Sequence, residues 1–380
     1  MERYLHSRVL KDLGSKMVFI SGPRQCGKTT FAQELLKASK SGRYLNWDSK
    51  DDRKTILDSS WVDQDNLIVL DEIHKYQKWK NLIKGIYDTQ KKIHQFLITG
   101  SALLDVYRKG QDSLFGRYHH WRLHPFCLAE NPLQDDPSQV LERLIERGGF
   151  PEPFLAESAV DAKRWAKSHM DLLIKEDLRD LSFIKDLTAI EQLYEGLRAR
   201  VGSIISNANI ARDIEVAPKT VKQWIAILES LYIIFSIKPY SGKMIRALTK
   251  PSKIYVFNNP EVDGDEGAKF ENLVATHLLK RVHFLEDSMG EKFELSYLRD
   301  KEGREVDFVI LKSKKPICLI EAKYNSDQPS GHLNYFGDKL KIAKRIQLVQ
   351  KLKKSSKLKN IEIIPAAQFL SKPLDQNIFE

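Results

Sequence analysis

The stretch GPRQCGKTT, Gly22–Thr30, fits the pattern GxxxxGK[ST] of a phosphate-binding loop at each defined position. In such a loop the glycines, here Gly22 and Gly27, let the backbone turn tightly, so that its N–H groups point at phosphate oxygens. The pattern assigns Lys28 to the β- and γ-phosphates and the Thr29 hydroxyl to Mg²⁺. We therefore predict that ATP binds here with Mg²⁺. The other loop residues expected to line the nucleotide are Pro23, Arg24, Gln25, Cys26 and Thr30.

The surrounding sequence has the strand and helix signals that this loop requires. The apolar run 17–22 precedes the loop and predicts a buried strand, and residues 29–38 follow it with helical periodicity. Further strands are expected at 43–48, 67–72 and 96–102. Strands that alternate with helices predict an α/β fold with a parallel sheet, whose ligands bind at the carboxyl ends of the strands.

Polar residues follow two of these strands. Asp71 ends the run LIVLD, where Mg²⁺ needs a carboxylate, and Glu72 is a candidate general base for the attacking water. Thr99 and Ser101 are expected to contact the γ-phosphate. Nucleotide binding without hydrolysis stays open, because the role of Glu72 depends on geometry. Arg117 is a candidate arginine finger, which would neutralise charge on the transferring phosphoryl group.

Length, composition and charge bound the class of protein. The chain has 380 residues, 42% of them hydrophobic and 29% charged, which is typical of two or three globular domains. It shows neither a membrane-spanning stretch nor a signal peptide, and its three cysteines are scattered, so we expect a cytoplasmic protein with reduced thiols. The net charge is +10, and residues 339–359 carry nine Lys or Arg and no acid. This segment is either a solvated face or a nucleic-acid contact.

The later motifs complete a set that resembles a known prokaryotic family. RQCGKTT, YLNWD, LIVLDEIHK, FLITGSA, FGR with Pro125 downstream, and GGFPEP occur in the order and spacing of AAA-type ATPases joined to a C-terminal domain of unknown function. The resemblance covers about residues 3–325. It implies an AAA+ ATPase that forms a ring or other homo-oligomer, with Arg117 reaching a neighbouring subunit. One departure is Cys26, where the family more often has valine or another small apolar residue.

The middle of the chain predicts helices. Residues 131–200 are expected to be helical, and 203–214 and 219–234 to form a helix–turn–helix, which the resemblance extends to a winged helix. Two strands are expected within 235–256, around a basic turn. Contact with DNA and a structural or protein-docking role both remain open. The candidate DNA-binding residues are Lys219, Thr220, Lys222 and Gln223 on the second helix, and Lys243 and Arg246 on the turn.

The last part of the chain carries a carboxylate pattern. We expect a helix at 266–281, strands at 293–299, 304–311 and 316–323, and then basic helices. Asp307, Glu321 and Lys323 share one face of neighbouring strands, as in a nuclease that holds Mg²⁺ with carboxylates and orients water with a lysine. This is the PD-(D/E)XK pattern, and the resemblance implies the same fold, with Glu271 as the helix carboxylate. The predicted metal ligands here are Glu271, Asp307 and Glu321; the predicted catalytic residues are Asp307, Glu321 and Lys323.

These patterns predict four segments: an AAA+ core at 1–130, a helical lid at 131–200, a winged helix at 201–256 and a restriction-endonuclease-like α/β domain at 257–380. The first hypothesis is a Mg²⁺-dependent, oligomeric ATPase that acts on DNA by remodelling, translocation or cleavage, with branched and single-stranded DNA among the candidate partners. The second is an ATP-switched DNA-binding regulator with an inert nuclease-like domain. The third is an ATP-dependent protein-handling factor whose C-terminal part docks partners.

Overall fold

The structure is a computed structural model that describes residues 2–100, 114–173, 178, 186–241 and 251–379. The chain divides into two compact units. The N-terminal unit comprises Met1–Pro125 with Ser230–Tyr232, and the C-terminal unit comprises Phe126–Glu229 with Ile233–Glu380. Among the helices of the described ranges, none has the length and apolar character needed to span a bilayer.

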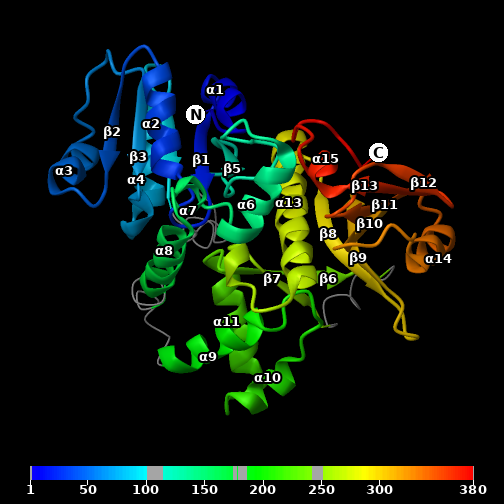
Figure 1. The fold of residues 1–380 in the computed structure, drawn as a ribbon. Helices are drawn as coiled ribbons and strands as arrows, with labels where there is room; N and C mark the ends of the chain where they lie inside the picture. The colour runs from blue at the N-terminus through cyan, green and yellow to red at the C-terminus, as the bar shows by residue number, and fades with distance from the viewer. Residues whose placement is uncertain (1, 101–113, 174–177, 179–185, 242–250, 380) are drawn as a thin grey trace. The chain divides into compact units, whose positions relative to one another are not determined.

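The N-terminal unit is built on a parallel sheet with the order β2-β3-β4-β1-β5 (Figure 1). This arrangement confirms the predicted parallel sheet and its four expected strands. The fifth strand, β5, was not predicted, because YHHWR lacks an apolar run and in this strand only Trp121 is fully buried. The strands are β1 Met17–Ser21, β2 Gly42–Asn46, β3 Leu67–Asp71, β4 Gln95–Thr99 and β5 Tyr118–Arg122. The helices are α1 His6–Leu13, α2 Lys28–Ala38, α3 Lys50–Asp58, the 3₁₀ turn η1 Ile73–Lys75, and α4 Trp79–Gln90.

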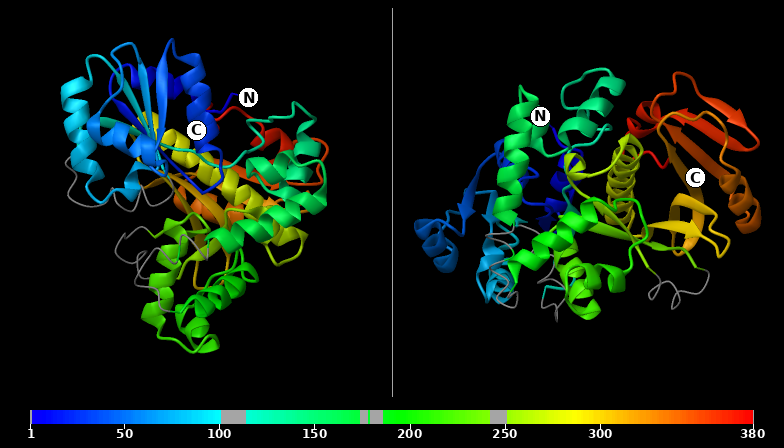
Figure 2. Two further views of the ribbon diagram at one scale, coloured as in Figure 1. Left: turned by 90° about the vertical axis from the view of Figure 1, so that its left-hand side faces the viewer. Right: turned by 60° about the horizontal axis from the view of Figure 1, so that its bottom comes forward.

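Alternating side chains give this sheet two apolar faces, each covered by helices (Figure 2). Phe19, Leu70 and Ile98 lie in a buried cluster with Ile56 of α3 and Ile83 of α4. The other face packs on α1, which contacts β1 and β4, and on α2, which contacts β2, β3 and β4. Both faces are therefore buried, and the carboxyl ends of the strands are left as the place for polar side chains.

Helices come first in the C-terminal unit. They confirm the helical character predicted for 131–200 within the described residues, and the expected helix pair is present as α10 and α11. The helices are α6 Pro137–Arg147, α7 Pro151–Leu155, α8 Ala159–Leu172, α9 Leu187–Arg198, α10 Asn207–Asp213 and α11 Pro218–Ser230. Ser206 caps α10, since its side chain accepts a hydrogen bond from the Asn209 amide.

The second sheet has the order β12-β13-β11-β10-β9-β8-β6-β7. Its strands are β6 Ile234–Pro239, β7 Lys253–Val256, β8 Phe293–Arg299, β9 Glu305–Lys312, β10 Lys315–Lys323, β11 Lys344–Val349, β12 Ser356–Leu358 and β13 Ile361–Pro365. The 3₁₀ turn η3 Asn259–Glu261 and the helices α13 Glu266–Met289, α14 Gly331–Leu340 and α15 Ala366–Leu370 accompany it. The long helix α13 contacts β7, β8 and β10 (Figure 1). Because β6 pairs with β8 in parallel, through Lys238↔Ser296 and Pro239↔Tyr297, the strands of the predicted winged helix and of the predicted nuclease-like segment form one sheet.

The prediction of basic helices after residue 323 was wrong for most of the segment. Helix α14 ends at Leu340, and the basic residues that follow lie largely on β11, β12 and their connections. Several of these cations are paired with acids from elsewhere in the sequence: Lys344 with Glu362 at 3.2 Å, and Arg345 with Asp338 at 2.7 Å. Arg345 is buried, so it belongs to the interior and not to a solvated basic face.

Candidate functional site

The phosphate-binding loop joins β1 to α2 and is tightly packed. An added Cβ at Gly22 would lie 2.1 Å from the carbonyl oxygen of Leu123, so a larger residue does not fit there. Gly27 has a φ of 92°, a conformation that favours glycine. The ammonium of Lys28 donates to the carbonyl oxygens of Gly22 at 3.1 Å and Pro23 at 2.6 Å. The loop therefore holds its lysine inward, next to the backbone that would surround a phosphate.

Two further contacts support the loop. Cys26 is fully buried, and its thiol donates to the Leu123 carbonyl at 3.3 Å, so this departure from the family pattern serves as a packing residue. Arg3, 7% exposed, donates to the carbonyl oxygens of Cys26 at 3.1 Å and His124 at 2.6 Å. Arg3 could not be predicted from its neighbours in the sequence, because its partners are backbone atoms farther along the chain.

The carboxylate of Asp71 is the centre of a hydroxyl cluster at the end of β3. One carboxylate oxygen accepts from the Thr29 hydroxyl at 2.8 Å and from the Tyr44 hydroxyl at 2.6 Å. The other accepts from the Thr99 hydroxyl at 2.6 Å. Asp71 is only 2% exposed, and the three hydroxyl donors satisfy the hydrogen-bonding needs of its buried carboxylate.

This cluster brings together three predicted residues and one that was missed. Thr29, Asp71 and Thr99 were expected near the nucleotide, and they do lie together. Tyr44 was not singled out, because its role depends on the register of β2 against β3. Burial, and then the hydrogen bond to Asp71, raise the pKa of the Tyr44 hydroxyl, which keeps it a donor at neutral pH. Ser101 lies outside the described residues.

Glu72 follows directly and has a left-handed backbone, with a φ of 57°. Its amide donates to the Thr99 carbonyl at 3.0 Å. Its carboxylate lies 3.6 Å from Nε2 of His74 and 3.7 Å from Nζ of Lys75, which in turn pairs with Asp48 at 2.6 Å. Burial, followed by the charge of Asp71, raises the pKa of Glu72. A carboxylate with a raised pKa is suited to accept a proton.

Arg117 lies at the amino ends of the strands, whereas the loop lies at their carboxyl ends. It precedes Tyr118, which pairs with Met17 at the start of β1, whereas Gly22 follows the end of β1. Its guanidinium makes two hydrogen bonds to the carboxylate of Asp88, at 2.8 and 3.0 Å. Within one chain, Arg117 therefore does not face the loop, and any contact with a γ-phosphate requires a neighbouring copy.

The helix pair has the two faces predicted for it. Ile210 and Ala211 of α10 are buried, and Lys219 of α11 is exposed and Thr220 half-exposed. Lys243 and Arg246 lie outside the described residues. The buried residues of α11 are Val221, Trp224, Ile225 and Leu228, and its further exposed residues include Lys222 and Gln223.

The predicted nuclease-like residues also come together. Asp307 on β9 and Glu321 on β10 lie on antiparallel neighbours, beside the pair Ile320↔Phe308. The Asp307 amide donates to Glu321 at 3.4 Å, and Lys323 pairs with Glu321 at 2.9 Å. Burial, and then the charge of Asp307, raise the pKa of Glu321 to about 8.

Glu271 of α13 joins this group through a lysine that the sequence did not suggest. Lys253 of β7 lies 3.2 Å from Glu271, 2.6 Å from Glu305 and 3.7 Å from Asp307. Burial, and then the charge of Asp307, raise the pKa of Glu271 to about 7. Within the described part of the chain, no group of three or more His, Cys, Asp or Glu side chains has an arrangement that could hold a metal ion.

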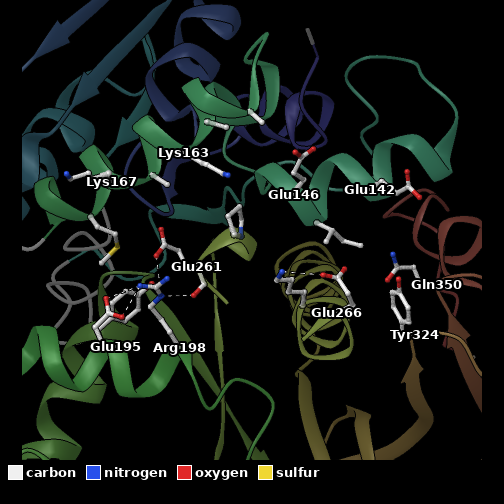
Figure 3. Close-up of a pocket in the computed structure, with 18 of the residues that line it drawn as sticks. Glu142, Glu146, Lys163, Lys167, Glu195, Arg198, Glu261, Glu266, Tyr324 and Gln350 are labelled. Carbon is white, nitrogen blue, oxygen red and sulfur yellow. Dashed lines mark hydrogen bonds and ion pairs between the residues drawn. The ribbon is translucent and has the colours of Figure 1, made fainter. Parts of the chain in front are cut away.

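A separate cavity of about 990 Å³ lies in the C-terminal unit (Figure 3). Its lining comes from α6, α8, α9, η3, α13 and the residues that follow β10 and β11, and it includes seven acids and five bases. Arg198, for example, pairs with Glu195 at 2.9 Å and with Glu261 at 3.5 Å. Of the predicted site residues that the structure describes, none lines this cavity.

Comparison with known families divides the chain into three segments. Residues 14–131 match an AAA domain. Residues 138–259 match a domain of unknown function (DUF8612), and residues 266–369 match another (DUF4143). These matches, with the loop and the parallel sheet, fit a P-loop ATPase core followed by C-terminal domains of unknown function.

Three individual proteins are similar to this chain, over different shares of its length and of their own. An uncharacterized protein of Mycobacterium tuberculosis is 25% identical over 244 residues, which cover 63% of this chain and 54% of that protein, so the chain spans about half of its length. An uncharacterized protein of Haemophilus influenzae is 21% identical over 395 residues, 92% of this chain and 93% of its own. A Walker-type ATPase of Pyrococcus abyssi aligns with 13% identity and a TM-score of 0.44, over 69% of this chain and 94% of that structure.

Proposed function

We propose that the chain binds ATP with Mg²⁺ at the loop Gly22–Thr29 and hydrolyses it. The observation that carries this proposal is the 2.8 Å hydrogen bond between the hydroxyl of Thr29 and the carboxylate of Asp71, beside a loop that positions Lys28. Hydroxyl and carboxylate oxygens suit Mg²⁺, so Thr29 and Asp71 would hold the ion. When bound, Mg²⁺ neutralises charge on the phosphate oxygens.

The other working parts follow from their positions. Lys28 would leave its loop carbonyls and bind the β- and γ-phosphates. Glu72 would take a proton from water as the water oxygen bonds to the γ-phosphorus, while the bond from that phosphorus to the bridging oxygen breaks and ADP and phosphate leave. Thr99 keeps the Asp71 carboxylate in place, and Thr99 also holds the backbone of Glu72.

Glu72→Gln separates hydrolysis from binding. We expect ATP to bind with unchanged affinity and the hydrolysis rate to fall by about 10²- to 10⁴-fold, the contribution typical of a general base. Glu34→Gln, the same change on α2, is the matched control. Hydrolysis by Glu72→Gln within threefold of the control contradicts the role of Glu72. Binding of ATP without hydrolysis by the unaltered chain favours an ATP-switched binding protein.

We further propose that the C-terminal unit contacts DNA. The observation that favours this function is the exposed face of α11, where Lys219 and Lys222 stand opposite a buried apolar face, in a chain with a net charge of +10. We expect affinity to fall with salt with a log–log slope of roughly −0.9 for each phosphate neutralised. Replacing both lysines with glutamate should weaken binding and flatten this slope. Equal losses in the control, Lys50→Glu with Lys54→Glu on α3, or no DNA binding, favour protein docking instead.

Arg117 provides a test of self-association. We propose that it acts on the nucleotide of a neighbouring copy in a homo-oligomer, since it lies away from its own loop. Arg117→Ala and Lys28→Ala chains should each be inactive alone, and a mixture should regain part of the ATPase rate, because intact loops then meet intact arginines. A mixture as inactive as its components, or a monomeric native mass with ATP, contradicts this arrangement.

A further inference from the structure

The acidic cluster of the C-terminal sheet has an ammonium group at its centre. Nζ of Lys253 lies 2.6 Å from the carboxylate of Glu305, 3.2 Å from that of Glu271 and 3.7 Å from that of Asp307. These residues come from β7, β9 and α13, and Lys253 is only 2% exposed. The side chains of these three acids are only 14–21% exposed, and a partly buried carboxylate is stabilised by a cation beside it; here one lysine contacts all three.

Three further residues pack around Glu271 and Lys253. The hydroxyl of Tyr255, a fully buried side chain, donates to the same Glu271 oxygen as Lys253, at 2.7 Å. An added Cβ at Gly202 would lie 3.0 Å from that oxygen, so the Gly202 backbone covers the carboxylate. The ring of Tyr297, itself buried, lies over Lys253, with its centroid 5.8 Å from Nζ.

The carboxylate oxygens of Asp307 and Glu321, the other two predicted metal ligands, are also engaged. The other oxygen of Asp307 accepts from the Ala322 amide at 3.0 Å. The two oxygens of Glu321 interact with Lys323 at 2.9 Å and with the Asp307 amide at 3.4 Å. Mg²⁺ demands about six oxygen ligands at about 2.0–2.1 Å, several of them usually water. Nζ of Lys253 instead lies between Glu271 and Asp307, and Lys323 pairs with Glu321, so the residues do not fit a divalent ion.

We infer that Lys253 is the permanent cation of the Glu271–Glu305–Asp307 cluster, and that this cluster is a structural lock that joins β7 to β9 and α13 in place of a metal centre. The lock holds the hairpin β6–β7 against the rest of the sheet, next to the short parallel contact of β6 with β8. Its residues all lie in the C-terminal unit, whereas the phosphate-binding loop lies in the N-terminal unit.

Divalent-ion binding tests the inference directly. The full chain carrying Asp71→Asn, without nucleotide, removes the metal site of the phosphate-binding loop and serves as the parent. Binding of Mn²⁺ to the parent and to parent with Asp307→Asn is measured by electron paramagnetic resonance. We expect the same number of bound ions in both. One additional ion in the parent, or Mn²⁺-dependent DNA cleavage that Asp307→Asn abolishes, overturns the inference.

Replacing the lysine tests the lock itself. Lys253→Met removes this cation from Glu271 and Asp307, whereas Glu305 keeps its pair with Arg299 at 2.8 Å, so we expect a lower thermal midpoint for the C-terminal unit. We also expect Mn²⁺ to raise that midpoint more than it does in the parent. Lys269→Met, the same change at the more exposed pair with Glu266, is the control. Equal midpoints for the two variants overturn the lock. If Lys253→Met fails to fold while Lys269→Met folds, the lock is supported, and the Asp307→Asn comparison still decides the metal question.

Discussion

Replacing Tyr44 with phenylalanine removes one hydroxyl donor from Asp71 and leaves the ring in place. The donor is 2.6 Å from an oxygen that also accepts from Thr29, a separation typical of a strong hydrogen bond to a charged group. Such a bond contributes about 1.5–3 kcal/mol. If this stabilisation is what orients Asp71 for Mg²⁺, its loss weakens the apparent Mg²⁺ affinity by roughly 10- to 150-fold.

The assay is phosphate release by the Tyr44→Phe chain at saturating ATP, titrated with Mg²⁺. We expect the Mg²⁺ concentration for half-maximal rate to rise while the rate at saturating Mg²⁺ changes little, because Tyr44 positions Asp71 and does not touch the substrate. Tyr87→Phe is the matched control. Its hydroxyl also lies in the N-terminal unit, but it hydrogen-bonds the backbone of Met17, the first residue of β1, at the end of the strands opposite Asp71.

The two variants distinguish positioning from general destabilisation. Both lose a hydroxyl group with a hydrogen bond, so both are expected to unfold at a somewhat lower temperature. Only Tyr44→Phe should shift the Mg²⁺ dependence. An unshifted Mg²⁺ titration for Tyr44→Phe, or an equal shift in Tyr87→Phe, refutes the assignment of Tyr44 to the metal site.

Three further predictions concern stability and nucleotide affinity. Burial lowers the pKa of His277 from 6.5 to about 4, so between these pH values the unfolded chain binds more protons than the folded chain. The free energy of unfolding of the C-terminal unit should therefore fall by up to about 3 kcal/mol as the pH falls through this range. Hydrogen exchange of α13 measures this loss, and an equal loss in His277→Gln contradicts the assignment to His277. Gly22→Ala places a Cβ 2.1 Å from the carbonyl oxygen of Leu123, which corresponds to an overpacking cost of about 1–3 kcal/mol. We expect ATP affinity to weaken by roughly 5- to 150-fold in a direct binding assay. Unchanged affinity would mean that the loop adapts to the added methyl group. Lys280→Met removes the cation that pairs with the buried side chain of Glu130 and should cost about 3–5 kcal/mol in denaturant unfolding of the C-terminal unit. We expect recovery when Lys280→Met is combined with Glu130→Leu; no recovery in the double variant argues against the loss of this ion pair as the cause.

Features that depend on local sequence were predictable. The glycines and Lys28 of the loop act within a few residues of one another, and Asp71 ends an apolar strand. Tyr44, Arg3 and Lys253 could not be found in this way, since each meets partners that only the strand register or the tertiary fold brings close. For Lys253, the partners lie on β9 and α13, which are separate in sequence.

The basic segment 339–359 was predicted wrongly because its local pattern is ambiguous. Its lysines and arginines alternate irregularly with apolar residues, a pattern that fits one face of a helix as well as a strand. The structure places Lys344–Val349 on β11, a central strand that pairs with β10 and β13. Arg345 is tolerated there because its guanidinium donates to the carbonyl of Ile342 and pairs with Asp338. Charge alone therefore did not determine exposure.

The parallel pairing of β6 with β8 has a consequence for how this chain can be divided. Two family matches meet between residues 259 and 266, yet strands from both sides of that junction belong to one sheet. A fragment that ends at 259 carries β6 paired with β7 but without β8, and exposed strand edges promote aggregation. A fragment that begins at 266 keeps Glu271, Glu305 and Asp307 but loses Lys253. The segments that sequence similarity separates are thus a single folding unit, and neither half is expected to survive alone as a soluble, native-like piece.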